Sequence, residues 1–199
     1  MKILMVSDVY FPRVNGVSTS IATFRRELEA QGHEVHLIAP DYGKVTDDER
    51  NIHRIPARSL VLDPEDRMLK TGEAWKRFKR FEAVGFDVVH VHTPFVAHYL
   101  AVRLARRLGI PVVETYHTFF EEYLLLLPKS FMRFLARRFS ASQCNALHGM
   151  VVPSSAMLDK LRTYGVITPA EIIPTGLEPE SFELGDGRAF CAKHGIGTE

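Results

Sequence analysis

Three histidines fall at or near the ends of two apolar segments, where imidazoles could act in catalysis or bind a metal. His90 and His92 lie two residues apart in FDVVHVHTP, so a strand would place both on one face, and His117 ends the segment PVVETYH. A zinc site needs three or four ligands, and the remaining nearby candidate, His98, falls where a helix is expected to start. We therefore expect no metal site, and we expect His90 to be a buried, hydrogen-bonded imidazole.

A second candidate site is the loop that precedes the first predicted helix. Asn15-Gly16 leads directly into Val17, and the backbone N–H groups of Gly16, Val17 and Ser18 could face a phosphate, because a helix N-terminus carries unpaired N–H groups and partial positive charge. The alternative is that Asn15-Gly16 is only a turn that caps the helix. The loop has no GxGxxG, which disfavours a nicotinamide or flavin site, and no GxxxxGK[ST], which excludes a standard P-loop.

The sequence contains no motif that indicates a hydrolase. The sequence has no GxSxG, and neither Cys144 nor Cys191 lies in a recognisable nucleophile context. Asp8 follows the first apolar segment and could act as an acid or base, but we expect it to cap the loop that follows it.

A basic amphipathic helix is predicted over Lys129–Asn145, a segment without acidic residues. Its basic stripe and its apolar stripe lie roughly opposite each other, and they comprise Lys129, Arg133, Arg137 and Arg138 on one side and Phe131, Leu135 and Phe139 on the other. Two interpretations remain open. The helix could lie on an anionic bilayer, where each basic residue contributes about 1 kcal/mol, or it could pack its apolar stripe on the sheet with its charges solvated.

Composition indicates a soluble globular protein. The 199 residues are 46% hydrophobic and 25% charged, and a net charge of +1 selects no polyanionic partner, so we expect no nucleic-acid binding. Only four apolar residues precede Ser7-Asp8, too few for a secretory or membrane-spanning segment. We predict a reduced cytoplasmic protein that is peripheral to the inner face of the membrane if the basic helix binds lipid.

Short apolar segments alternate with helical patterns along the chain, which predicts an α/β fold with a doubly wound, mainly parallel, Rossmann-like sheet. The predicted strands are Lys2–Ser7, Glu34–Ala39, Ile52–Ile55, Phe86–Val91, Pro111–Tyr116, Gly149–Val152 and Glu171–Ile173. The predicted helices are Val17–Leu28, Glu73–Val84, Tyr99–Leu108, Lys129–Asn145, Ser154–Tyr164 and Gly187–His194. The last helix has no following strand and cannot bury its apolar face alone, so we expect one domain over 1–175 and a crossover with the truncated start of a second domain over 176–199.

The first twenty residues, KILMVSDVYFPRVNGVSTSI, resemble the opening of retaining glycosyltransferases of family four, which have the two-domain GT-B architecture. GHEVHLIAP, FDVVHVHTP, PVVETYHTFFEEY, VVPS and IIPTGLEPESF follow in the family's order. The likeness is greatest to the branch that glycosylates lipids, such as diacylglycerol glucosyltransferases and phosphatidylinositol mannosyltransferases. One departure is Thr175-Gly176-Leu177-Glu178, where the family often has Asn-Gly-Val-Asp.

The resemblance implies that the chain is the acceptor-side half of an enzyme that moves a sugar from a UDP- or GDP-sugar to a lipid or carbohydrate acceptor, without a cofactor or required metal. Asn15, Gly16, Val17 and Ser18 would meet the donor diphosphate, and His117 would sit beside the donor sugar. We also expect a set of cleft or acceptor residues, namely Tyr10, His92, Thr93, Tyr116 and Thr118.

Membrane contact would fall to Lys129, Phe131, Arg133, Arg137 and Arg138. The basic residues and paired acidic motif that complete catalysis belong to the family's other domain, so we expect these 199 residues to be inactive alone. Two alternatives stay open: a non-catalytic domain that binds an acceptor or a membrane, and a GT-B-type sugar-nucleotide epimerase.

Overall fold

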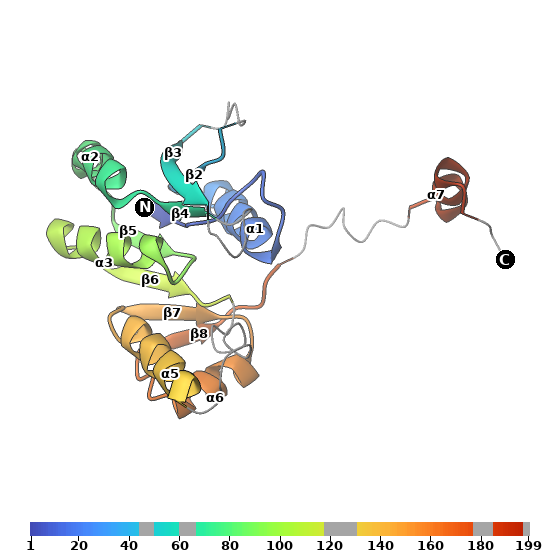
Figure 1. The fold of residues 1–199 in the computed structure, drawn as a ribbon. Coiled ribbons are helices and arrows are strands. Elements are labelled where there is room, and N and C mark those ends of the chain that lie inside the picture. Colours follow the sequence, from blue (N-terminus) through green and yellow to red (C-terminus); the bar gives the residue numbers. More distant parts are fainter. Residues whose placement is uncertain (44–49, 60–66, 118–130, 177–184, 197–199) are drawn as a thin grey trace.

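The computed structural model describes residues 1–43, 50–59, 67–117, 131–176 and 185–196, and within them a single twisted sheet forms the centre (Figure 1). The strand order is β4-β3-β2-β1-β5-β6-β7-β8, with every neighbouring pair parallel except β3 and β4. The strands are β1 (Lys2–Val6), β2 (Glu34–Asp41), β3 (Ile52–Ser59), β4 (Arg67–Leu69), β5 (Val88–Val91), β6 (Val112–Thr115), β7 (Gly149–Val152) and β8 (Ala170–Ile172). The predicted fold class is confirmed.

All seven predicted strands are present, and β3 runs four residues further than expected. Leu4, Met5 and Val6 of β1 are completely buried, as expected for a central strand that is covered on both faces and therefore reads as a continuous apolar segment. The eighth strand, β4, was not predicted, because three residues at the antiparallel edge carry no distinct apolar pattern.

Helices cover the two faces of the sheet, and the last helix lies apart from it. They are α1 (Gly16–Ala30), α2 (Thr71–Glu82), α3 (Val96–Leu108), α5 (Phe131–Cys144), α6 (Ser155–Thr163) and α7 (Gly187–His194). Ser154 caps α6 as predicted, since its side chain accepts a hydrogen bond from the Met157 N–H at 3.2 Å. Gly109 ends α3 in the left-handed conformation that favours glycine (φ 67°).

Alternate residues of β1 enter two separate cores. Leu4 and Val6 pack with Phe78 of α2, Leu104 of α3 and other buried side chains that include those of α6. Ile3 and Met5 face the opposite side and pack with Ile21 of α1. Helix α1 therefore covers one face near β1 and β2, whereas α2, α3, α5 and α6 belong to the other face (Figure 1).

Helix α7 stands apart from the sheet (Figure 1). Asp186 caps it, since its carboxylate accepts hydrogen bonds from the N–H groups of Arg188 and Ala189, but none of its residues is buried and Phe190 is exposed. The expectation that this short helix cannot bury its apolar face alone is confirmed.

Candidate functional site

The sheet brings the candidate site residues to one edge. The strand order reverses at β1, which lies between β2 and β5, and in open parallel sheets ligands bind beyond the carboxyl ends of the strands at such a point. Val6 pairs with Val91 of β5, and Val91 pairs with Glu114 of β6. The segments that follow β1, β5 and β6, which hold the glycine turn and the histidines, therefore leave the sheet at the same edge.

The glycine turn caps α1 and stays open. The Asn15 Oδ1 accepts a hydrogen bond from the Ser18 N–H at 2.8 Å, so Asn15 caps the helix and the Ser18 amide is already engaged. Among the described residues, none accepts a hydrogen bond from the amides of Gly16 or Val17. A Cβ added at Gly16 would meet no atom within 4 Å, and Gly16 has no positive φ. The fold itself therefore does not require glycine here, and the turn leaves room for a ligand to approach the backbone.

The three histidines form a continuous cluster. His90 is buried, and its Nε2 lies 2.7 Å from the Thr115 hydroxyl, which confirms the expectation of a hydrogen-bonded core imidazole. The rings of His90 and His92 are 4.1 Å apart at their centroids, and the His92 Nδ1 lies 3.2 Å from the His117 Nε2. Phe24 of α1 packs edge-on against His90 at 5.6 Å. His92 and His117 are thus brought together, with His117 the more exposed of the two.

Burial keeps this cluster uncharged. Desolvation lowers the pKa of His90 to about 3, with the charge of His117 as a second cause. Desolvation also lowers the pKa of His117 to about 4, and it holds the pKa of His92 well below its usual value of 6.5. At neutral pH, His117 therefore offers a neutral hydrogen-bonding imidazole to a ligand rather than a cation.

Asp8, which follows β1, is a buried carboxylate that binds three other segments of the chain. The expectation that it caps its own loop is wrong: the carboxylate accepts hydrogen bonds from the Ala97 N–H at 2.8 Å, the Thr93 hydroxyl at 3.1 Å and the Leu69 N–H at 3.2 Å. The physical reason is that α3 has no capping side chain of its own at Phe95, so Asp8 satisfies its first turn. Desolvation raises the pKa of Asp8 from 3.8 to about 6, although these hydrogen bonds act to lower it.

The structure places one predicted cleft residue, Tyr116, on the other face of the sheet from the histidine cluster. Tyr116 packs in the opposite core and donates a hydrogen bond from its hydroxyl to the Ser140 Oγ of α5 at 3.3 Å, because consecutive residues at a strand end point to opposite faces. Tyr10 is buried against α1. The Thr93 hydroxyl is engaged by Asp8, and Thr118 lies outside the described residues.

Helix α5 exposes apolar as well as basic side chains. Arg133, Arg137 and Arg138 are exposed, while Lys129 and the Phe131 side chain lie outside the described part. Leu135 is 41% exposed, so the interpretation in which the apolar stripe packs on the sheet does not hold for this residue; the neighbouring Phe134 is 53% exposed. Among the described side chains of α5, the buried ones are instead small or polar, namely Ala136, Ser140, Gln143 and Cys144.

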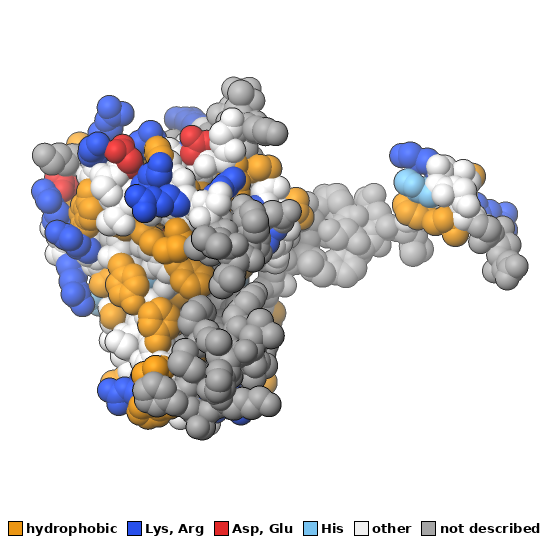
Figure 2. Space-filling model, viewed as in Figure 1, with side chains coloured by type: hydrophobic (Ala, Val, Ile, Leu, Met, Phe, Trp, Pro, Cys, Tyr) orange, Lys and Arg blue, Asp and Glu red, His pale blue; other side chains and the backbone are white. Residues whose placement is uncertain are grey.

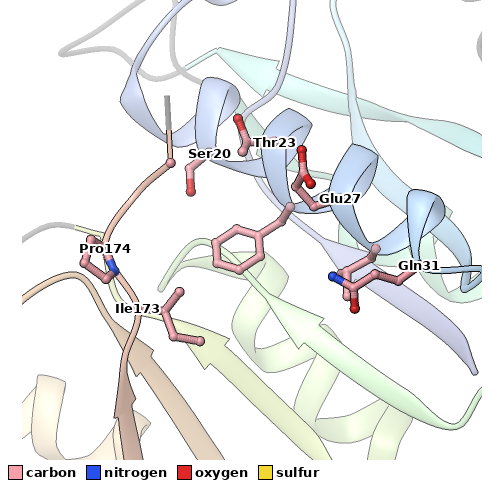
Figure 3. A pocket seen from close by; sticks show the side chains of 9 residues that line it. Ser20, Thr23, Glu27, Gln31, Ile173 and Pro174 are labelled. Carbon is pink, nitrogen blue, oxygen red and sulfur yellow. The ribbon is translucent and has the colours of Figure 1, made fainter. Parts of the chain in front are cut away.

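A pocket of about 280 Å³ lies between α1 and the segment after β8, a feature with no signal in the sequence. Figure 3 shows Ser20 and Thr23 of α1 near Ile173 and Pro174. The Ser20 and Thr23 hydroxyls are buried without a hydrogen-bond partner in the described structure. The residues that line the pocket begin beyond the first turn of α1, so the pocket is distinct from the Gly16 turn. The Phe24 side chain lines the pocket and also contacts the histidine cluster.

The described residues hold neither a metal-binding cluster nor a membrane-spanning helix. They contain no group of three or more His, Cys, Asp or Glu side chains placed to hold a metal ion. None of the described helices combines the length and apolar character needed to cross a bilayer.

Comparison with known proteins gives a consistent family. Residues 14–181 match the profile described as Glycosyltransferase Family 4. The chain is 34% identical over 192 residues to an alpha-monoglucosyldiacylglycerol synthase of Streptococcus pneumoniae, covering 92% of this chain and 42% of that protein. It is 32% identical over 125 residues to a GDP-mannose-dependent alpha-mannosyltransferase of Mycobacterium tuberculosis, covering 59% of this chain and 32% of that protein.

The fold has close counterparts among solved structures. The Anabaena protein HepE in complex with UDP-glucose superposes with a TM-score of 0.68 at 13% identity, over 98% of this chain and 50% of that one. The chain therefore spans about half or less of each of these three proteins.

Proposed function

Because the chain belongs to glycosyltransferase family 4, we propose that it is the N-terminal, acceptor-side part of an enzyme that transfers a sugar from a nucleotide-sugar donor to a lipid or glycolipid acceptor. Residues 1–175 would form the acceptor-side domain, and residues 176–199 the crossover toward a donor-binding domain. The relatives named above support this proposal, one by its diacylglycerol-derived product and the other by its GDP-mannose donor.

The observation that carries the proposal is the open turn at Gly16. The amides of Gly16 and Val17 lie at the N-terminus of a 15-residue helix, where the helix dipole favours an anion. In the transfer, the bond between the anomeric carbon and the diphosphate oxygen breaks, the nucleoside diphosphate departs, and the acceptor oxygen bonds to the anomeric carbon while its proton is released. Donors aimed at the departing diphosphate stabilise the charge that develops on it.

His117 would contact the donor sugar across from this turn. Its imidazole lies at the same sheet edge and is neutral at neutral pH, since burial lowers its pKa to about 4. A neutral imidazole suits hydroxyl groups of a sugar better than phosphate oxygens, so we assign the sugar to His117 and the diphosphate to the amides. The acceptor hydroxyl would then approach from the side of this domain.

Helix α5 would place the enzyme on an anionic membrane. Arg133, Arg137 and Arg138 are exposed next to Phe134 and Leu135, so cationic and apolar groups share one surface. Figure 2 shows an apolar patch on the face that α3 and α5 cover, bordered by Lys and Arg side chains. The exposed Phe95 and the exposed Tyr99 of α3 belong to the same helical layer. This combination fits a peripheral helix that inserts apolar side chains between anionic headgroups.

The test is an activity assay of the full-length protein with UDP- and GDP-sugars and a diacylglycerol or glycolipid acceptor in vesicles. We expect sugar transfer with one of the donors. His117→Ala should lower the rate of transfer about tenfold or more. His33→Ala should leave that rate unchanged, because the His33 side chain contacts the N-terminus at the other edge of the sheet. The 199-residue chain alone should be inactive. Robust turnover by that chain, or a full-length protein that transfers no sugar, would contradict the proposal.

A further inference from the structure

We propose that His92 is a positioning residue: its ring fixes the tautomer of His117, so that His117 presents its Nδ1–H to the donor sugar. This inference rests on the proposed function, because it assigns a task to the sugar-facing histidine. It concerns a buried residue whose side chain has no route to the substrate itself, since His92 is only 2% exposed.

The contact between the two rings is direct. The His92 Nδ1 lies 3.2 Å from the His117 Nε2, and the rings stack with an interplanar angle of 26°. On its other side, His92 packs against the ring of His90 at 4.1 Å, and the ring of Phe24 lies 6.1 Å away. His92 is therefore held in place by packing, and this hydrogen bond is the polar contact through which it can set the tautomer of His117.

The second nitrogen of His92 decides the direction of that bond. The His92 Nε2 is buried and has no hydrogen-bond partner among the described residues. A neutral imidazole carries one N–H, so the proton sits either on Nε2, as a buried donor without an acceptor, or on Nδ1, where it is donated to His117. Buried N–H groups without acceptors are rarer in folded proteins than under-used acceptors. The Nδ1–H tautomer of His92 is thus favoured.

The tautomer of His117 follows from that of His92. If His92 donates from Nδ1, the His117 Nε2 must accept, and a neutral His117 then carries its proton on Nδ1. Within the described chain, the His117 Nδ1 makes no hydrogen bond. It is therefore available as a donor toward an oxygen of the bound sugar, and it is fixed in that role before the substrate arrives. Such preorganisation avoids a reorientation cost during the reaction.

The direct test is a measurement of histidine tautomers by NMR on the ¹⁵N-histidine-labelled chain, using two-bond proton–nitrogen correlations. The His117 signals are assigned by their loss in His117→Gln. We expect the Nδ1–H form of His117 in the wild type. In His92→Phe, which keeps a ring but no nitrogen, we expect a shift toward the Nε2–H form. In His92→Asn, whose side-chain amide nitrogen can occupy the position of Nδ1, we expect the wild-type form.

Kinetics of the full-length enzyme then test the consequence. We expect His92→Phe to lower kcat about tenfold with little change in KM, and His92→Asn to recover most of that loss. An Nε2–H form of His117 in the wild type, or no tautomer change in His92→Phe, overturns the inference and leaves the proposed function intact. An unchanged kcat in His92→Phe overturns it as well. If His117→Ala is also fully active, the assignment of His117 to the sugar fails with it.

Discussion

Replacing Gly16 tests the diphosphate site without disturbing the fold. A Cβ at Gly16 meets nothing within 4 Å and φ is not positive, so Gly16→Ala should leave the free energy of unfolding unchanged or raise it by about 0.4–1 kcal/mol. Gly16→Asp adds a carboxylate at the first residue of α1, where the helix dipole stabilises it by about 0.3–1 kcal/mol. Neither substitution is therefore expected to destabilise the fold.

The same substitutions should weaken or abolish donor binding. A hydrogen bond from an amide to a charged phosphate contributes about 1.5–3 kcal/mol, so displacing the ligand from one amide in Gly16→Ala should weaken donor affinity by about ten- to a hundredfold. Gly16→Asp adds direct repulsion, of order 4 kcal/mol for unit charges about 4 Å apart at a protein surface, and should abolish measurable binding.

Gly72 provides the matched control. It lies in the first turn of α2, has no positive φ, and a Cβ there also meets nothing within 4 Å. The assay is calorimetric titration of the full-length protein with its nucleotide sugar, together with denaturant unfolding of each variant. Equal loss of affinity in Gly72→Asp, or wild-type affinity in Gly16→Asp, would show that the diphosphate does not bind at the Gly16 turn.

Three further predictions follow from the same structure. Burial raises the pKa of Asp8 in the folded state from 3.8 to about 6, so its contribution to stability is present below about pH 4 and is lost as the pH rises to about 6. The free energy of unfolding, measured with denaturant, should therefore fall by roughly 3 kcal/mol over this range in the wild type. The same decline in Asp8→Asn would contradict the assignment to Asp8. Replacing Arg133, Arg137 and Arg138 by Gln should weaken the affinity for phosphatidylserine vesicles, measured by sedimentation, by about a hundredfold, at about 1 kcal/mol per charge. The exposed Arg26→Gln on α1, which covers the opposite face of the sheet, should have little effect, and a comparable loss in that variant would remove α5 as the membrane surface. Chelation with EDTA should leave transfer by the full-length enzyme unchanged, and a loss that Mg²⁺ or Mn²⁺ restores would show that the diphosphate is met by a metal ion rather than by amides.

The sequence predicted the parts of the fold that depend on local pattern. The continuous apolar segment Lys2–Val6 indicates a strand covered on both faces, and Asn15 before a helical pattern indicates a cap; both are present. The edge strand β4 was missed because it depends on pairing with Ala57–Ser59 rather than on its own three residues.

The contacts that build the site depend on strand order, which a single sequence does not reveal. The His92–His117 contact spans 25 residues and the bond from Asp8 to the start of α3 spans 89, and both arise because β1, β5 and β6 are neighbours. The position of Tyr116 was predictable: alternation at a strand end places it opposite His117. On α5, Leu135 is exposed rather than packed on the sheet, because small side chains such as Ala136 and Ser140 make the buried contact.

The most direct test of the central claim is a crystal structure of the full-length protein with its intact nucleotide sugar. We expect diphosphate oxygens within hydrogen-bond distance of the Gly16 and Val17 amides, and the sugar next to the His117 imidazole. A diphosphate bound away from the N-terminus of α1, with the Gly16 turn facing solvent, would contradict it.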